Sequence, residues 1–198
     1  MNYIEDSFVD KNRPVQMKYH ELMDKIEAIS PDTFIHKIEK LMDEDPDFLD
    51  TYLLMHEVYQ DNGELKKADR VLDDAYNRAT NLITDKKGNW PESLMWGFHE
   101  NRHIIRTLLN KAIQLWDKSE REEALNLFRK LLKTNPNDNI GARNYILAIR
   151  MDMSFEEYEK RFNKGGYYDT DSINWFEENA PKYPDEFGWW FDWNDENV

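Results

Sequence analysis

The chain has 198 residues, 40% hydrophobic and 33% charged, so one globular domain with a substantial core is expected. Seven Gly and seven Pro favour helices over an all-β fold, and the absence of Cys excludes disulfides and thiolate metal sites. The formal net charge of −14 argues against nucleic-acid binding, which needs a basic face.

The amino-terminal residues MNYIEDSFVD contain acids and no apolar stretch, so no secretory signal is predicted. No apolar run approaches the roughly 18 residues that a membrane span needs. Together with the lack of Cys, these features predict a cytoplasmic protein that does not bind membranes.

The predicted elements are pairs of helices. The first pair joins a loosely patterned helix at about Pro14–Ile29 to one that starts at Ser30-Pro31, where Ser is a good cap and Pro suits the first turn. In the second pair, Tyr52, Met55 and Tyr59 form an apolar face, and Gly63 closes the turn with a positive φ. The partner helix faces back with Ala68, Leu72 and Ala75.

An insertion is predicted at residues 82–103. Phe34 and Ala68 lie 34 positions apart, but Ala68 and Ala124 lie 56 apart, which is 22 more than one step of 34. The insertion begins with the turn-rich stretch DKKGNWP, and a long helix is predicted to follow from about Glu92 to Trp116.

A third pair, Arg106–Asp138, has small residues where two helices must approach closely. Ala112 faces Ala124, which is followed by Phe128 and then by Pro136. In a fourth pair, Tyr158 replaces the small residue 34 positions after Ala124, so this pair is expected to be splayed or the last regular one.

This register resembles the tetratricopeptide repeat family over roughly Pro31–Phe162, through its A-x3-F…P core. The segments WGFHENRHIIR (Trp96–Arg106) and NPNDNIGAR (Asn135–Arg143) also resemble a bacterial subgroup of such proteins. The resemblance implies an all-α, right-handed solenoid of about eight helices over residues 1–164, followed by an acidic aromatic extension, 165–198, that packs on the repeats.

The family implies protein or peptide binding in a concave groove. The groove residues that the resemblance assigns are Arg106, Leu109, Ile113, Trp116, Arg143, Leu147 and Arg150. Residues 102–150 carry ten bases and five acids, whereas 151–198 carry four bases and thirteen acids, so an acidic partner is favoured. Alternatively, the arginines pair with Glu100, Asp138 or the acidic tail and only hold helices together.

His99-Glu100-Asn101-Arg102-His103 matches the zincin pattern H-E-x-x-H, in which two histidines bind zinc and the glutamate activates water. The pattern has only three fixed positions and its filling residues are polar. Polar residues satisfied on a long helix are the preferred interpretation, and a zinc hydrolase is the less favoured alternative.

The tail concentrates aromatic residues, with four of the seven Trp after Asn174, and Gly165-Gly166 separates it from the repeats. It could cap the last repeat, lie in the basic groove as a built-in ligand, or contact a second copy of the chain. The expected function is therefore a non-catalytic adaptor or scaffold without a cofactor. The alternative is a self-associating module whose groove is filled by its own tail.

Overall fold

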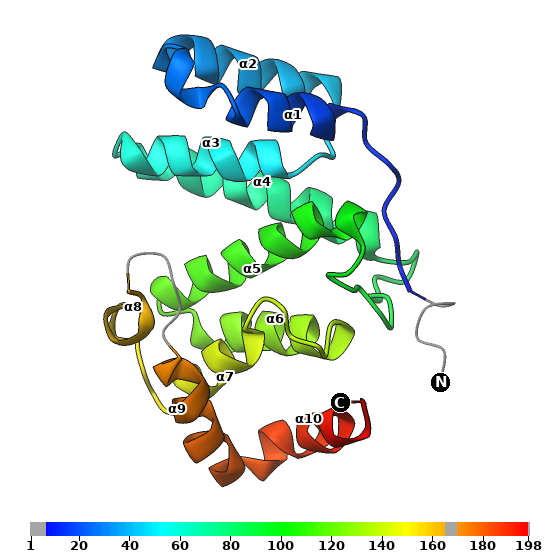
Figure 1. Cartoon of the computed structure of the whole chain (residues 1–198), viewed down its shortest axis with the longest axis vertical. Coiled ribbons are helices and arrows are strands. Elements are labelled where there is room, and N and C mark those ends of the chain that lie inside the picture. Colours follow the sequence, from blue (N-terminus) through cyan, green and yellow to red (C-terminus); the bar gives the residue numbers. More distant parts are fainter. Residues whose placement is uncertain (1–6, 165–169, 198) are drawn as a thin grey trace. The chain divides into compact units, whose positions relative to one another are not determined.

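A computed structural model describes residues 7–164 and 170–197 of the chain (Figure 1). Over these residues the protein has ten α-helices, 72% helix and no strand, which confirms the all-α class. The chain divides into two compact units, Met1–Lys111 and Ala112–Val198. The predicted domain boundary falls between residues 164 and 165, at the Gly165-Gly166 pair. Both glycines fall within residues 165–169, which lie outside the described residues.

The first unit is a series of antiparallel neighbours that pack in chain order: α1 on α2, α2 on α3 and α3 on α4. The helices are α1 (Val15–Met23), α2 (Pro31–Glu44), α3 (Asp50–Asp61), α4 (Leu65–Ile83) and the first part of α5 (Arg102–Asp117). Ser30 caps α2 as predicted, because its hydroxyl accepts the N–H of Thr33 at 3.3 Å.

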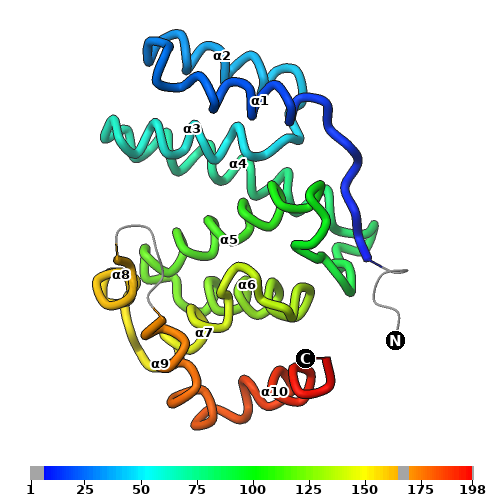
Figure 2. Tube along the Cα trace, viewed as in Figure 1, coloured from blue at the N-terminus to red at the C-terminus, as the bar shows by residue number. Residues whose placement is uncertain are grey.

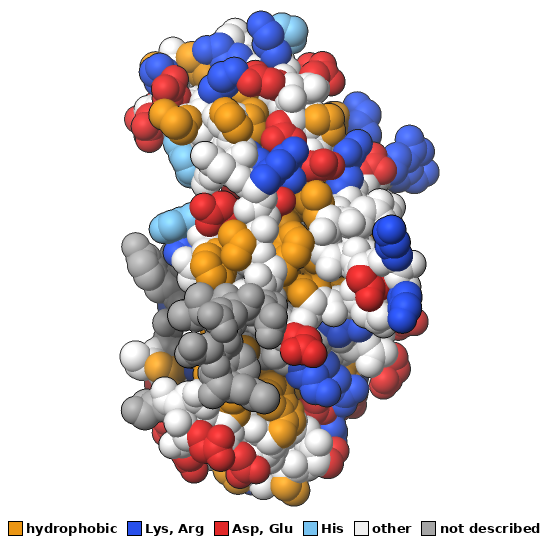
Figure 3. All heavy atoms as spheres, turned by 90° about the vertical axis from the view of Figure 1, so that its right-hand side faces the viewer, with side chains coloured by type: hydrophobic (Ala, Val, Ile, Leu, Met, Phe, Trp, Pro, Cys, Tyr) orange, Lys and Arg blue, Asp and Glu red, His pale blue; other side chains and the backbone are white. Residues whose placement is uncertain are grey.

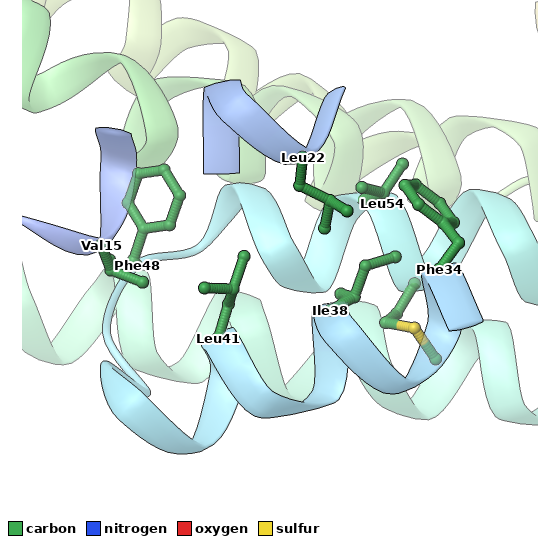
Figure 4. Packing of buried hydrophobic residues seen from close by; sticks show 8 residues of the cluster. Val15, Leu22, Phe34, Ile38, Leu41, Phe48 and Leu54 are labelled. Carbon is green, nitrogen blue, oxygen red and sulfur yellow. The ribbon is translucent and has the colours of Figure 1, made fainter. Parts of the chain in front are cut away.

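The core of this unit forms where α1, α2 and α3 meet. Figure 4 shows Leu22 of α1 pointing toward Leu41 and Ile38 of α2, with Leu54 of α3 nearby. Ile38 is fully buried, and the three leucines are less than a tenth exposed. Burial of such side chains contributes about 1.5–3 kcal/mol each, which holds the loosely patterned α1 in place.

The residues predicted to face back from α4 lie where α3 and α4 pack closely. Ala68, Leu72 and Ala75 are at most 1% exposed, and Gly63 turns the chain with φ of 73°. A ring nitrogen of His56 on α3 lies 2.9 Å from the carbonyl oxygen of Ala68. The polar ring is thus accommodated by a hydrogen bond to the backbone of the facing helix.

The predicted helix from Glu92 is wrong, because α5 begins only at Arg102, after a short 3₁₀ turn at His99–Asn101. Residues 84–98 form an irregular connection after α4. In Figure 2 the segment before α1 runs back to this connection, and a backbone bridge joins Ser7 to Ser93. The side chain of Asn101 donates to the carbonyls of Phe8 and Met95, which fixes the connection in a non-helical path.

The second unit contains the carboxyl-terminal end of α5 and five further helices. These are α6 (Arg121–Thr134), α7 (Ala142–Arg150), α8 (Phe155–Phe162), α9 (Asp171–Asn179) and α10 (Pro184–Asn197). Helix α6 packs on α7, and α7 on α9. Tyr158 of α8 is 1% exposed and contacts Tyr145 and Phe162, so the large residue in the small-residue position is accommodated in an aromatic core.

Among the described helices, none has both the length and the apolar character needed to cross a membrane.

We expect Ala68→Leu to lower the free energy of unfolding by about 1–3 kcal/mol, because a larger side chain at a fully buried helix crossing must displace its neighbours. Leu65→Ala in the same helix is the matched control, since Leu65 is 62% exposed. Urea denaturation of both variants measures the difference. Equal loss of stability in the two would contradict the close approach of α3 and α4 at Ala68.

Candidate functional site

The residues predicted to line a groove are divided between the two units. Arg106 and Leu109 belong to the first unit, and the other five belong to the second. Arg106 donates to the buried carboxylate of Asp50 through both Nε, at 2.9 Å, and Nη2. Its guanidinium also lies 5.7 Å from the ring centre of Trp96. Arg106 therefore ties α5 to the start of α3, while Leu109 and Ile113 are half-buried.

Trp116 and Leu147 are core residues of the second unit. Trp116 is 2% exposed, and its indole N–H donates to the carbonyl of Met153 at 3.2 Å. Its ring contacts Phe128 and Tyr145 edge-on, and Leu147 is fully buried. Neither side chain presents surface to a ligand in this structure, because these two positions, which the resemblance assigned to a groove, face the protein interior.

Arg143 stabilises the turn that precedes α7. The buried carboxylate of Asp138 accepts the backbone N–H groups of Ala142 at 2.7 Å and Arg143 at 3.1 Å, and it also accepts the Arg143 guanidinium at 3.1 Å. Asp138 and Gly141 have positive φ values of 49° and 72°. Burial raises the pKa of Asp138 to about 6, although Arg143 and the N–H groups act against the shift. The NPNDNIGAR segment thus encodes a helix start.

Arg150 and a residue that the sequence analysis did not select, Arg129, share one carboxylate of the tail. Glu186 of α10 accepts from Nε of Arg129 at 2.7 Å and from Nη1 of Arg150 at 2.6 Å. Burial alone would raise the pKa of Glu186, but the hydrogen bonds and charges of Arg129 and Arg150 outweigh it and lower the pKa. Asp185 accepts from Arg150 Nη2 at 2.8 Å.

The tail is also fixed by its aromatic residues. The indole N–H of Trp190 donates to the carbonyl of Pro136 at 2.9 Å, and Phe187 is fully buried. The guanidinium of Arg143 lies 5.3 Å from the ring centre of Phe176 and 5.0 Å from that of Trp190. Of the partners considered for the arginines, Asp138 and the acidic tail are therefore the ones that bind Arg143 and Arg150.

A cleft of about 630 Å³ remains open between α6, α7 and α10, and we call it the α10 cleft. Its lining residues are Asn126, Arg129, Lys130, Leu132, Lys133, Ile146, Arg150, Asp185, Glu186 and Trp189. Its volume falls within the range of roughly 300–1,000 Å³ that is usual for ligand pockets. The α10 cleft is the strongest candidate for a binding site in the second unit.

The charges of the α10 cleft are only partly balanced. Asp185 and Glu186 match the charges of the two arginines, and Lys133 adds a positive charge that they do not balance. Lys133 is exposed, and no carboxylate of the described residues lies within 4 Å of its ammonium group. Trp189 is 37% exposed at the same cleft and offers an apolar contact.

The H-E-x-x-H histidines do not converge. His99 lies in the 3₁₀ turn and is exposed, whereas His103 is 3% exposed in α5. Nδ1 of His103 accepts the N–H of Leu49 at 3.2 Å, so the ring proton lies on Nε2, which donates to Asp10 at 3.0 Å. Among the described residues, no group of three or more His, Asp and Glu side chains is arranged to hold a metal ion.

His103 instead belongs to a buried polar cluster around Asp10. Nε of Arg13 donates to the Asp10 carboxylate at 2.6 Å, and Nη1 of Arg13 reaches Asp45 at 2.7 Å. The backbone N–H of Asp10 donates to the side chain of Asn101 at 2.9 Å. Burial acts to raise the pKa of Asp10, but the hydrogen bonds from His103 and Arg13 prevail and lower it to about 2.

Comparison of the chain with family models, with curated proteins and with solved structures finds no match.

Sequence reasoning missed Arg129, Lys133, Glu186 and Trp189. The signal that could have found them was the contrast between the basic segment 102–150 and the acidic segment 151–198, since opposite charges of this density attract. The groove positions that the family resemblance assigns lie only on the first helix of each pair, whereas Arg129 and Lys133 lie on the second.

We expect the contribution of Asp10 to stability to be complete above about pH 4 and to be lost as the pH falls toward 2, because its pKa is lowered from 3.8. Asp10→Asn should therefore cost about 2 kcal/mol at pH 7 and progressively less toward pH 2. Urea denaturation at pH 7, 4 and 2.5 measures this. A difference between wild type and variant that does not change with pH would contradict the buried ion pair.

Proposed function

We propose that this protein is a non-catalytic adaptor or scaffold that holds an acidic protein or peptide segment in the α10 cleft. The observation that carries the proposal is an open cleft of about 630 Å³, in which the exposed ammonium group of Lys133 and the exposed ring of Trp189 line the same cavity. No step of the proposal uses a metal or a cofactor.

The chemistry of the cleft favours a ligand with both acidic and apolar residues. Lys133 can attract a carboxylate, while Trp189, which is 37% exposed, supplies apolar area. Aromatic side chains at a partly exposed position are effective contacts, because they bury a large area at low entropic cost. Arg129 and Arg150, already bound by Glu186, hold the wall of the cleft.

We further propose that the fold is a tetratricopeptide-like, right-handed solenoid in the cytoplasm, with α9 and α10 as its aromatic cap. Helix α3 packs on α4 within the predicted second pair, and α6 packs on α7 where the predicted third and fourth pairs adjoin. Together with the small residues Ala68 and Ala124 at buried positions, these contacts support the repeat interpretation. The absence of Cys is consistent with a reducing compartment.

The peptide EELWEE, carrying a fluorescent label, is the probe for this proposal, with KKLWKK as its charge-reversed counterpart. We expect the acidic peptide to bind and the basic one not to bind. Lys133→Glu should weaken binding about tenfold, because an attractive exposed charge becomes a repulsive one. Fluorescence anisotropy in about 0.15 M salt, where distant charges are screened, measures the affinity.

Lys160→Glu is the matched control, since Lys160 is exposed on α8 of the same unit and does not line the cleft. Equal weakening by Lys133→Glu and Lys160→Glu would reduce the effect to net charge. Equal binding of the two peptides would rule out the acidic ligand.

A second candidate function is a self-associating or purely structural module. In this module the basic residues bind the protein's own tail and no foreign ligand. The burial of Glu186, which is 8% exposed, and its contacts with Arg129 and Arg150 favour this candidate. Removing α10 from α6 and α7 would expose Phe187 and Trp190, which contribute roughly 1.5–3 kcal/mol or more each when buried. That cost argues against routine release of the tail.

We expect Glu186→Gln to lower the free energy of unfolding by about 1–3 kcal/mol, because two guanidinium groups lose a charged partner. Asp185→Asn is the control, and it should have a much smaller effect because the Asp185 side chain is 66% exposed. If the affinity for EELWEE is unchanged in Glu186→Gln, the tail only lines the cleft and does not compete with the ligand. A several-fold gain would mean that the tail competes with the ligand, and sedimentation equilibrium of wild type reports self-association directly.

A further inference from the structure

The first unit contains a separate cleft between α1 and α2, which we call the lysine cleft. Its volume is about 370 Å³. Its lining residues are Lys18, Glu21, Leu22, Lys25, Lys37, Lys40, Leu41 and Glu44. None of these residues belongs to the second unit, so the lysine cleft is independent of the function proposed above.

The apolar lining of the cleft is part of the packed core. Leu22 is 6% exposed and Leu41 is 8% exposed, and Figure 4 shows both among the core side chains contributed by α1 and α2. Because Leu22 and Leu41 pack within the core, the apolar floor of the cleft is part of the folded structure. The four lysines are exposed around this apolar lining.

Half of the positive charge at the cleft is not balanced by the acids that line it. Lys18 binds Glu44, so these two residues cancel. Within the described part of the chain, no carboxylate lies within 4 Å of the ammonium groups of Lys25, Lys37 or Lys40. Glu21 is the other acid that lines the cleft, which leaves an excess of two positive charges among the lining residues.

This excess is unusual in a chain with a net charge of −14. Ammonium groups that outnumber the nearby carboxylates repel one another and make the local electrostatic potential more positive, which favours the binding of an anion. Lysines on an ordinary solvated helix face need not surround a cavity, whereas the four lysines of α1, α2 and the turn between them line one cleft. The combination of a cleft with an apolar floor and an excess of positive charge is what points to a ligand.

We propose that the lysine cleft binds a small, multiply charged anion that carries phosphate groups. Lysine is a frequent ligand of phosphate, which it binds as a point charge without the geometric demands of arginine. A volume of about 370 Å³ lies at the small end of the range for low-molecular-weight ligands, which favours a small anion over a macromolecular segment. The phosphate groups can come from a free polyphosphate or from a nucleotide.

Isothermal titration of the full-length protein with inorganic tripolyphosphate in about 0.15 M salt tests the proposal. We expect saturable binding of one equivalent. The double variant Lys37→Gln/Lys40→Gln should weaken it about tenfold, because two exposed charge contacts are lost. Both lysines are exposed on α2, so the variant should fold, and circular dichroism checks that it does.

The matched control is Lys86→Gln/Lys87→Gln, which removes two adjacent exposed lysines of the same unit that do not line the cleft. Unchanged affinity in this control supports a specific site. Non-saturable binding, or the same loss in both double variants, would overturn the proposal, because either result indicates general charge attraction.

A second titration with ATP distinguishes the sources of the phosphate groups. Tighter binding of ATP than of tripolyphosphate, lost in Lys37→Gln/Lys40→Gln, supports a nucleotide whose base lies on the apolar lining. Tighter binding of tripolyphosphate supports a free polyphosphate. Binding of ATP that the double variant leaves unchanged would place the nucleotide elsewhere and contradict the site.

Discussion

A carboxylate that is removed from water must be held by hydrogen-bond donors, and this requirement organises both units of the protein. In the first unit, Asp10 binds Arg13 and His103, which connects the segment before α1 to the beginning of α5. In the second unit, Asp138 fixes the start of α7, and Glu186 attaches α10 to two arginines. These pairings determine where several helices begin and what the tail contacts, while apolar burial supplies most of the stability.

The helical pairs could be predicted because their signals are local. Ser30, Gly63 and the small residue Ala68 act through their immediate neighbours, and each lies as expected. The groove could not be predicted in the same way. The family resemblance that assigned Trp116 and Leu147 to a groove marks positions along a repeat, but it does not say whether the side chain there meets a ligand or another helix. Partners distant in sequence decide the matter: Asp50, 56 residues away, binds Arg106, and Glu186 binds Arg129 across 57 residues.

The two basic residue types are used differently. Arginines such as Arg106, Arg129 and Arg150 bind carboxylates of the chain itself, as suits a planar group that forms two parallel hydrogen bonds. At the two clefts, the positive charge that has no carboxylate partner among the described residues belongs to lysines. These are Lys133 in the α10 cleft and Lys25, Lys37 and Lys40 in the lysine cleft. Figure 3 shows acidic and basic side chains interleaved on the face that it presents. Both proposed ligands are accordingly small anionic groups or segments.

The raised pKa of Asp138 makes folding a proton-uptake reaction over part of the acid range. Between about pH 4 and 6 the folded protein holds a proton on Asp138 that the unfolded chain releases, so this group favours the folded state below pH 4 and less so as the pH rises through 6. Asp10 acts in the opposite sense below pH 4. The two aspartates therefore give their largest combined contribution near pH 4. The heat of unfolding at pH 5 includes the ionisation heat of whichever buffer accepts the proton from Asp138.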